Sequence, residues 1–127
     1  MNGHVERRYI LLSVPLRLPD GRTNAIECVV DTGFQGALAL PPAAIHALGL
    51  PFRDTIAANL ANNTDVDIDV YKAVIVWNGQ ERAVDVLATG RRPLLDTMLL
   101  DGFHMGVDFI EGGQVTLNLL PVSNNVS

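Results

Sequence analysis

The chain has 127 residues, of which 48% are hydrophobic, and a formal net charge of −5. This length predicts a single domain spanning residues 1–127, with enough apolar sequence to fold around its own core. The negative charge argues against nucleic acid or an anionic membrane as the main partner, because both need a basic protein face.

Cysteine usage and the N-terminal sequence predict a cytoplasmic protein. Cys28 is the only cysteine, so no disulfide can form within the chain, and a reducing compartment fits. The N-terminus lacks a basic segment followed by an apolar one, which argues against a secretory leader. No apolar run approaches the roughly 18 residues that span a bilayer, so no membrane partner is expected.

Turn signals recur at short intervals and separate runs that are typical of strands. The predicted strands are, in chain order, residues 9–18, 23–30, 55–60, 66–77, 82–88, 103–109 and 114–119. The hairpin turns are expected at Asp20-Gly21, Asn78-Gly79 and Glu111-Gly112-Gly113. One short helix is predicted over residues 41–49, with proline in its first turn and glycine at its end. Residues 94–100 predict a strand end that runs into a helical turn, and the whole pattern indicates an all-β domain.

The strongest functional signal is Cys-Val-Val-Asp-Thr-Gly, residues 28–33. Val29 and Val30 are β-branched and favour a strand, and Gly33 permits a sharp turn after it. Asp31 is therefore expected at the mouth of a buried strand, partly removed from water, where a carboxylate is tuned for acid–base chemistry. Asp-Thr-Gly is also a good β-turn sequence by itself, because Asp closes an Asx turn and Gly adopts a positive φ.

This stretch resembles the Asp-Thr-Gly signature of aspartic peptidases, in particular the small retropepsin-like ones. The resemblance extends from about Tyr9 to Leu119. It includes the hairpin before the motif, a Leu-x-Leu-Pro after it, a flap hairpin around residues 61–64, and Leu94-Leu95 followed by residues 99–102, Leu-Leu-Asp-Gly. It implies the acid-protease fold, a closed β-barrel with one or two short helices.

The resemblance implies an aspartic endopeptidase that acts on peptides or proteins and needs no metal or other cofactor. Two carboxylates about 3 Å apart share one proton; the ionised one activates a water and the protonated one donates to the scissile carbonyl. A chain with a single Asp-Thr-Gly is then expected to act as a symmetric homodimer that pairs both copies of Asp31. Thr32 is implied to hydrogen-bond across the axis, and Gly33 completes the catalytic motif. The implied substrate-binding residues are Phe34, Ala61, Asn62, Asn63 and Thr64.

Asp96 stands where related proteins usually have glycine. It is expected to cap the helical turn at residues 98–100 and to point away from the catalytic loop. The alternative is a third negative charge directly behind that loop. This departure leaves a second interpretation open, in which the chain is a catalytically weak retropepsin-like module for peptide binding or dimerisation.

The remaining polar patterns predict no metal site. Three aspartates alternate with apolar residues over 65–70, which is typical of a half-exposed strand with its acids in water. A calcium loop would need glycine at its sixth position and glutamate at its twelfth. His4, His46 and His104 have no paired spacing of the kind that binds zinc.

Overall fold

The computed structural model describes residues 1–33, 36–59 and 62–121. Strands account for 58% of the described residues, which also form one short helix, so the predicted all-β class is confirmed. The helical elements are α1 (Pro42–Leu48) and one 3₁₀ turn, η1 (Thr97–Leu100). The strands are β1 (Asn2–Glu6), β2 (Tyr9–Arg17), β3 (Thr23–Val30), β4 (Leu38–Leu40), β5 (Phe52–Asn59), β6 (Asp65–Trp77), β7 (Gln80–Ala88), β8 (Leu94–Leu95), β9 (Phe103–Val107) and β10 (Gln114–Leu119).

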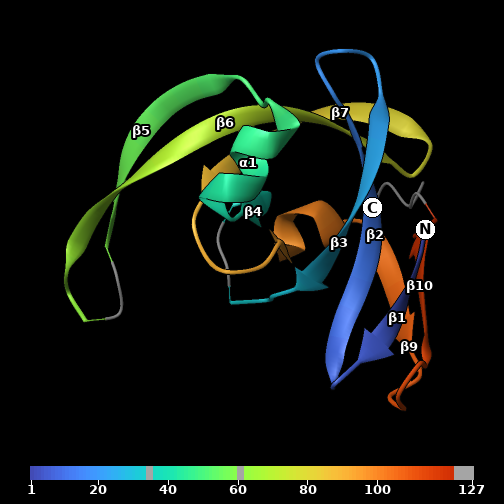
Figure 1. The fold of residues 1–127 in the computed structure, drawn as a ribbon. Coiled ribbons are helices and arrows are strands. Elements are labelled where there is room, and N and C mark those ends of the chain that lie inside the picture. The colour runs from blue at the N-terminus through green and yellow to red at the C-terminus, as the bar shows by residue number, and fades with distance from the viewer. Residues whose placement is uncertain (34–35, 60–61, 122–127) are drawn as a thin grey trace, which may run out of the picture.

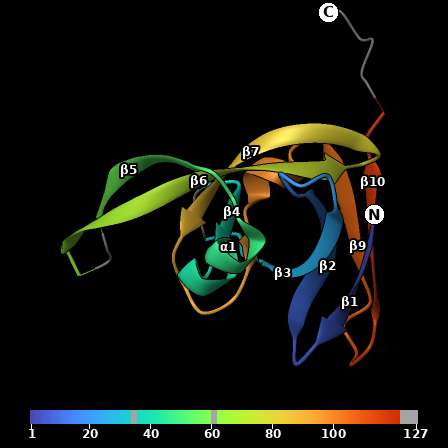
Figure 2. The same cartoon turned by 45° about the horizontal axis from the view of Figure 1, so that its top comes forward.

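All described strands belong to one curved sheet in the order β5-β6-β7-β4-β8-β3-β2-β1-β10-β9 (Figure 1). A further pairing joins β6 to β2 through Leu16↔Ile75 and Arg17↔Val74, so the two halves of the sheet meet. The β5–β6 hairpin projects from one side of the molecule, and β9 and β10 lie on the opposite side (Figure 2). No helix among the described residues is long and apolar enough to cross a membrane.

The core lies inside this curved sheet and follows from strand alternation. In β2, Leu12, Val14 and Leu16 are buried, whereas Ser13 and Arg17 between and beyond them are exposed. Such alternation places one face of a strand in the core and the other in water. The β1–β2–β3 part of the sheet therefore has an apolar inner face and a polar outer face.

Several boundaries match the turn chemistry of the sequence. Asn78 and Gly79 have φ values of 52° and 79°, so a two-residue turn joins β6 directly to β7, which begins at Gln80 rather than at 82. Helix α1 ends at Gly49, which has a φ of 67° and is left-handed. The strand expected over 103–109 ends at Val107, because the Ile110 N–H donates to the Asp108 carbonyl at 2.8 Å and turns the chain.

Strand β1 was not expected from the sequence. It is joined to β2 by Arg7 and Arg8, whose φ values are 52° and 69°. Arginine seldom adopts this left-handed conformation, and hairpin turns of this kind normally carry Asn or Gly. The turn is held from outside: the Arg7 N–H donates to Glu111 Oε1 at 2.8 Å and to Oε2 at 3.1 Å.

Candidate functional site

Asp31 directly follows β3, as the sequence predicts. Strand β3 pairs in parallel with β8 through Val29↔Leu94 and Val30↔Leu95. The Asp31 N–H donates to the Leu95 carbonyl at 2.9 Å, which extends this pairing by one residue. The pairing with β8 fixes the backbone of Asp31 at the carboxyl end of a strand in the middle of the sheet.

The carboxylate of Asp31 is oriented by the turn that follows it. Its Oδ1 accepts the Gly33 N–H at 2.9 Å, which closes an Asx turn. Asp31 is half-buried, whereas Thr32 and Gly33 are exposed. The expected position between core and solvent and the expected Asx turn are therefore both present, but Gly33 does not adopt the positive φ expected of it. Phe34, the next residue of the predicted site, lies outside the described part of the chain.

Asp96 caps η1, as expected. Its Oδ1 accepts the Thr97 N–H at 2.7 Å and the Thr97 hydroxyl at 3.1 Å. The expectation that it points away from the Asp31 segment is wrong. Its Oδ2 accepts the Gly36 N–H at 3.2 Å, and its own N–H donates to the Ala37 carbonyl at 3.2 Å.

This dual role follows from the strand ends. Val30 and Leu95 are paired neighbours in the parallel strands, so Asp31 and Asp96 are the next residues of adjacent strands. Asp96 is only 6% exposed, and it is the one buried polar or charged residue among those described. Its carboxylate has three donors, which is how a buried charge is kept in a folded protein. Asp96 therefore ties the segment after Asp31 to η1.

A cavity of about 350 Å³ begins on the segment that follows Asp31. Three elements besides that segment contribute to it: the β5–β6 hairpin, η1 and β7. The lining residues are Gly36, Ala37, Ile56, Lys72, Arg82, Ala83, Val84, Asp85, Leu87 and Met98. The cavity combines aliphatic walls with a few charged groups, as ligand pockets commonly do.

One face of the β5–β6 hairpin is turned toward this cavity. Ile56 lines it and pairs with Ile68, so both side chains are on the same face. Asp65, Asp67 and Asp69 alternate with these positions and are exposed on the opposite face. The expectation that these acids lie in water is confirmed, and they face away from the cavity.

The hairpin tip carries the remaining predicted binding residues. Ala61 lies outside the described residues. Asn62 Oδ1 accepts the Thr64 N–H at 3.1 Å, and Asn63 has a φ of 61°. No hydrogen bond or ion pair within residues 1–33, 36–59 and 62–121 joins this tip to Asp31 or Thr32. In Figures 1 and 2 the tip lies well apart from the end of β3.

Ion pairs hold the base of the hairpin to β7. Asp85 Oδ1 lies 2.9 Å from Lys72 Nζ as an ion pair, and Asp85 Oδ2 accepts a hydrogen bond from the Arg53 guanidinium at 3.4 Å. Because Lys72 and Asp85 also line the cavity, this network fixes the charged part of its wall. Partly exposed pairs of this kind contribute little to stability, so positioning is their main consequence.

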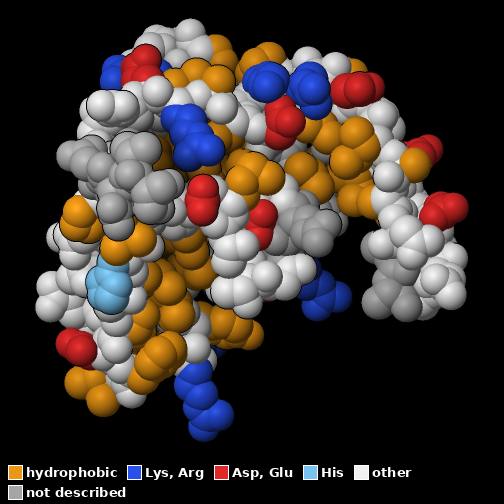
Figure 3. All heavy atoms as spheres, turned by 180° about the vertical axis from the view of Figure 1, so that it is seen from behind, with side chains coloured by type: hydrophobic (Ala, Val, Ile, Leu, Met, Phe, Trp, Pro, Cys, Tyr) orange, Lys and Arg blue, Asp and Glu red, His pale blue; other side chains and the backbone are white. Residues whose placement is uncertain are grey.

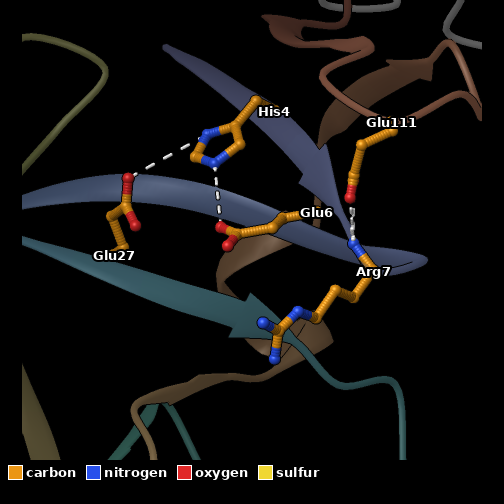
Figure 4. Close-up of polar contacts among 5 residues, drawn as sticks. All are labelled: His4, Glu6, Arg7, Glu27 and Glu111. Carbon is orange, nitrogen blue, oxygen red and sulfur yellow. Dashed lines mark hydrogen bonds and ion pairs between the residues drawn. The ribbon is translucent and has the colours of Figure 1, made fainter.

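A second polar cluster lies on the outer face of the sheet and was not expected from histidine spacing. The His4 ring lies 3.4 Å from Glu6 Oε2 through Nε2 and 3.9 Å from Glu27 Oε1 through Nδ1 (Figure 4). One ring nitrogen of His4 and one carboxylate oxygen from each of Glu6 and Glu27 all lie within 4.8 Å of one another. His4 and Glu6 are two positions apart on β1, so their side chains lie on the same face of the sheet. Glu27 lies on β3, on the other side of β2. The only sequence signal for this cluster is the period-2 spacing of His4 and Glu6.

No protein-family model matches the chain, and no curated protein matches it at a significant level.

Proposed function

We propose that the chain is an aspartic endopeptidase that acts as a homodimer, with Asp31 of each copy forming one dyad. The observation that carries this proposal is the placement of Asp31. Its backbone is held by the Leu95 carbonyl and its Oδ1 by the Gly33 N–H. Its other oxygen is free of protein hydrogen bonds among the described residues, as a carboxylate needs in order to bind water.

The chemistry follows from two such carboxylates on a twofold axis. Two carboxyl groups about 3 Å apart do not both ionise, because their negative charges would repel each other, so the pair shares one proton. The ionised carboxylate takes a proton from water as the water oxygen bonds to the peptide carbonyl carbon. The protonated carboxylate gives its proton to the carbonyl oxygen. The C–N bond then breaks: the amine nitrogen receives the proton that came from the water, and a hydroxyl of the tetrahedral intermediate returns a proton to the second carboxylate, which restores the dyad.

The surroundings of Asp31 fit a peptide substrate. The cavity starts at Gly36 and Ala37 and is bordered by Ile56 of the hairpin and Met98 of η1. Closure of the β5–β6 hairpin over a bound peptide would exclude water from the dyad. We assign the tip residues Asn62, Asn63 and Thr64 to this closing role. The β6–β2 pairing is consistent with the closed barrel of the acid-protease fold.

A second candidate function rests on Asp96. A buried carboxylate on the strand next to Asp31 adds negative charge where a dyad must hold one proton between two acids. A chain with this feature is also suited to bind peptides, or a second copy, without hydrolysing them. The two candidates differ in whether a peptide that occupies the cavity is cleaved.

Digestion of a proteome-derived peptide library, read by mass spectrometry, tests the proposal. We expect pepstatin-sensitive cleavage between about pH 3 and 7 that is lost in Asp31→Asn. Asp101→Asn, which changes an exposed aspartate at the end of η1, is the matched control and should cleave normally. Peptide binding without cleavage by the wild-type chain would favour the second candidate. Cleavage retained by Asp31→Asn at more than about a hundredth of the wild-type rate would refute the assignment, since a positioned acid–base group is worth 10²–10⁴-fold.

A further inference from the structure

The turn between β9 and β10 presents two large apolar side chains to solvent. Phe109 is 65% exposed and Ile110 is 70% exposed, the highest values among the exposed large hydrophobic side chains of the described residues. They line a hollow of about 750 Å³ together with Val5, Arg7, Arg8 and Glu111. We call these six residues the tip patch; it is separate from the tip of the β5–β6 hairpin. Adjacent exposed apolar side chains beside a hollow are typical of interaction surfaces.

The backbone under the tip patch is firmly held. The Val5 N–H donates to the Gly113 carbonyl at 2.9 Å, and the Gly112 N–H donates back to Val5 at 2.8 Å. Glu111 accepts the Arg7 N–H with both carboxylate oxygens (Figure 4). A Cβ on Gly113 would lie 1.8 Å from the Asp108 carbonyl oxygen, so the turn is also close-packed. Phe109 and Ile110 therefore project from a rigid support, and binding through them costs little ordering.

The tip patch lies at the same end of the sheet as Asp31. Strands β1 and β3 both run antiparallel to β2, so their carboxyl ends point the same way (Figure 1). The register Leu11↔Val29 places Asp31 level with Tyr9, which directly follows the Arg7–Arg8 turn. In Figure 3, hydrophobic and cationic side chains project together at this lower end of the molecule.

The charges of this end suit self-association. Two copies of a chain with a net charge of −5 repel each other overall. The two turns at this end, residues 7–8 and 108–113, however, carry two cations, Arg7 and Arg8, and two anions, Asp108 and Glu111. Among the described residues, Arg8 and Asp108 form no ion pair within the chain. A twofold contact pairs a patch with its own copy, so it needs projections, hollows and both charge signs on one surface.

We propose that the tip patch is a docking surface for a second copy of this chain, with Phe109 and Ile110 at the apolar centre of the contact. This inference rests on the proposed function, because the dyad needs two copies of Asp31 on one axis and the patch lies at the Asp31 end. A standard interface buries about 800 Å² on each partner. We expect the part of this area that the tip patch does not supply to come from the neighbouring residues around Asp31.

Sedimentation of the full chain and two double variants tests the proposal. Phe109→Asp/Ile110→Asp places charge at the centre of the contact. Leu119→Asp/Leu120→Asp is the matched control, because these side chains are 58% and 47% exposed. They lie at the carboxyl end of β10, away from the tip patch. We expect the first pair to raise the dimer dissociation constant about a hundredfold or more, as loss of central apolar contacts does. The control should stay within about threefold of wild type. Circular dichroism and thermal melting establish that both variants are folded.

Cleavage measurements separate this inference from the proposed function. The Phe109→Asp/Ile110→Asp variant should lose peptidase activity on dilution and recover it at high concentration, because its dyad residues are intact. Unchanged dimer affinity in a folded variant would overturn the tip patch as the contact and leave the peptidase proposal standing. A dimer broken by this variant, in a wild-type chain that cleaves nothing, would support the patch and refute the peptidase. A wild-type chain that is monomeric at millimolar concentration would overturn the patch.

Discussion

Asp96 shows how one residue can serve both a local cap and a distant segment. Its first oxygen caps η1 and its second accepts the Gly36 N–H at 3.2 Å, although Gly36 lies 60 positions away in the chain. A cap alone would make its loss a minor event, worth a few tenths of a kcal/mol for replacement by glycine. The contact with Gly36 changes this expectation, since a partly buried donor would lose its acceptor.

We therefore expect Asp96→Ala to destabilise the fold by about 1–3 kcal/mol, the usual cost of an unsatisfied buried partner. Asp96→Asn should cost less, because its amide oxygen can still accept the Thr97 N–H. Asp101→Ala is the control, since Asp101 is exposed at the other end of η1 and should change stability by less than about 0.5 kcal/mol. Urea unfolding of the three variants measures these differences. Equal effects at 96 and 101 would contradict the tie to Gly36.

Cys28 is the residue whose titration couples most clearly to folding. Burial raises the pKa of its thiol from 9.0 to about 12, because the thiolate would lose its hydration in the core. The folded chain thus retains a proton that the unfolded chain releases above pH 9. The stabilisation is complete below that pH and is lost as pH rises toward 12.

Between pH 8 and pH 10 we expect stability to fall by about 1.4 kcal/mol through this thiol alone. Chemical unfolding of wild type and Cys28→Ala across this range isolates the effect, since the alanine variant is less stable throughout but lacks the slope due to the thiol. Parallel pH profiles for the two proteins would contradict this expectation, because they would show that the Cys28 thiol is equally protonated in the folded and the unfolded chain.

At the scale of elements, the sequence predicts most strands well and fails where tertiary contacts decide. β2, β6 and α1 follow from apolar periodicity and from proline and glycine at their ends. β1 does not, because its turn consists of Arg7 and Arg8 in a left-handed conformation that Glu111 stabilises from the far end of the chain. No local signal announces a turn that depends on a residue 104 positions away.

The candidate site likewise combines residues that the local sequence predicts with residues that only the tertiary structure brings together. Asp31, Thr32 and Gly33 are recognised from an apolar strand followed by a turn motif, which is local information. The cavity that begins at Gly36 is lined by Ala37, Ile56 and residues of β7 and η1, which only the sheet order brings together. The same is true of His4 and Glu27, which face each other across β2.

The β1–β2 pairing depends on Gly3. A Cβ on this residue would lie 1.8 Å from the Leu11 carbonyl oxygen, a distance that no side chain can occupy. We expect Gly3→Ala to destabilise the fold by about 1–3 kcal/mol, as overpacking does, whereas Asn2→Ala on the same strand is nearly neutral. Thermal unfolding compares the two. A melting temperature for Gly3→Ala equal to that of wild type would show that β1 shifts to make room.

At the scale of the whole molecule, we propose that the chain supplies one half of a twofold site. Asp31 lies at the end of a strand within the sheet, and the hairpin with its cavity lies on one side of it. The tip patch lies at the same end of the sheet as Asp31, beyond β2 and β1. A second copy related by a twofold axis would supply the other carboxylate and cover the exposed apolar pair. The central claim is that two copies of Asp31 act in one site.

Mixing wild type with Asp31→Asn tests this claim most directly. The two proteins are combined above the dimer dissociation constant, allowed to exchange, and assayed for cleavage at a fixed amount of wild-type chain. If one dyad needs both copies, an equal amount of Asp31→Asn lowers the activity to about half, and a ninefold excess lowers it to about a tenth, because random pairing leaves that share of wild-type chains in wild-type dimers. Activity that stays constant at every ratio would show that each chain works alone and would contradict the shared dyad.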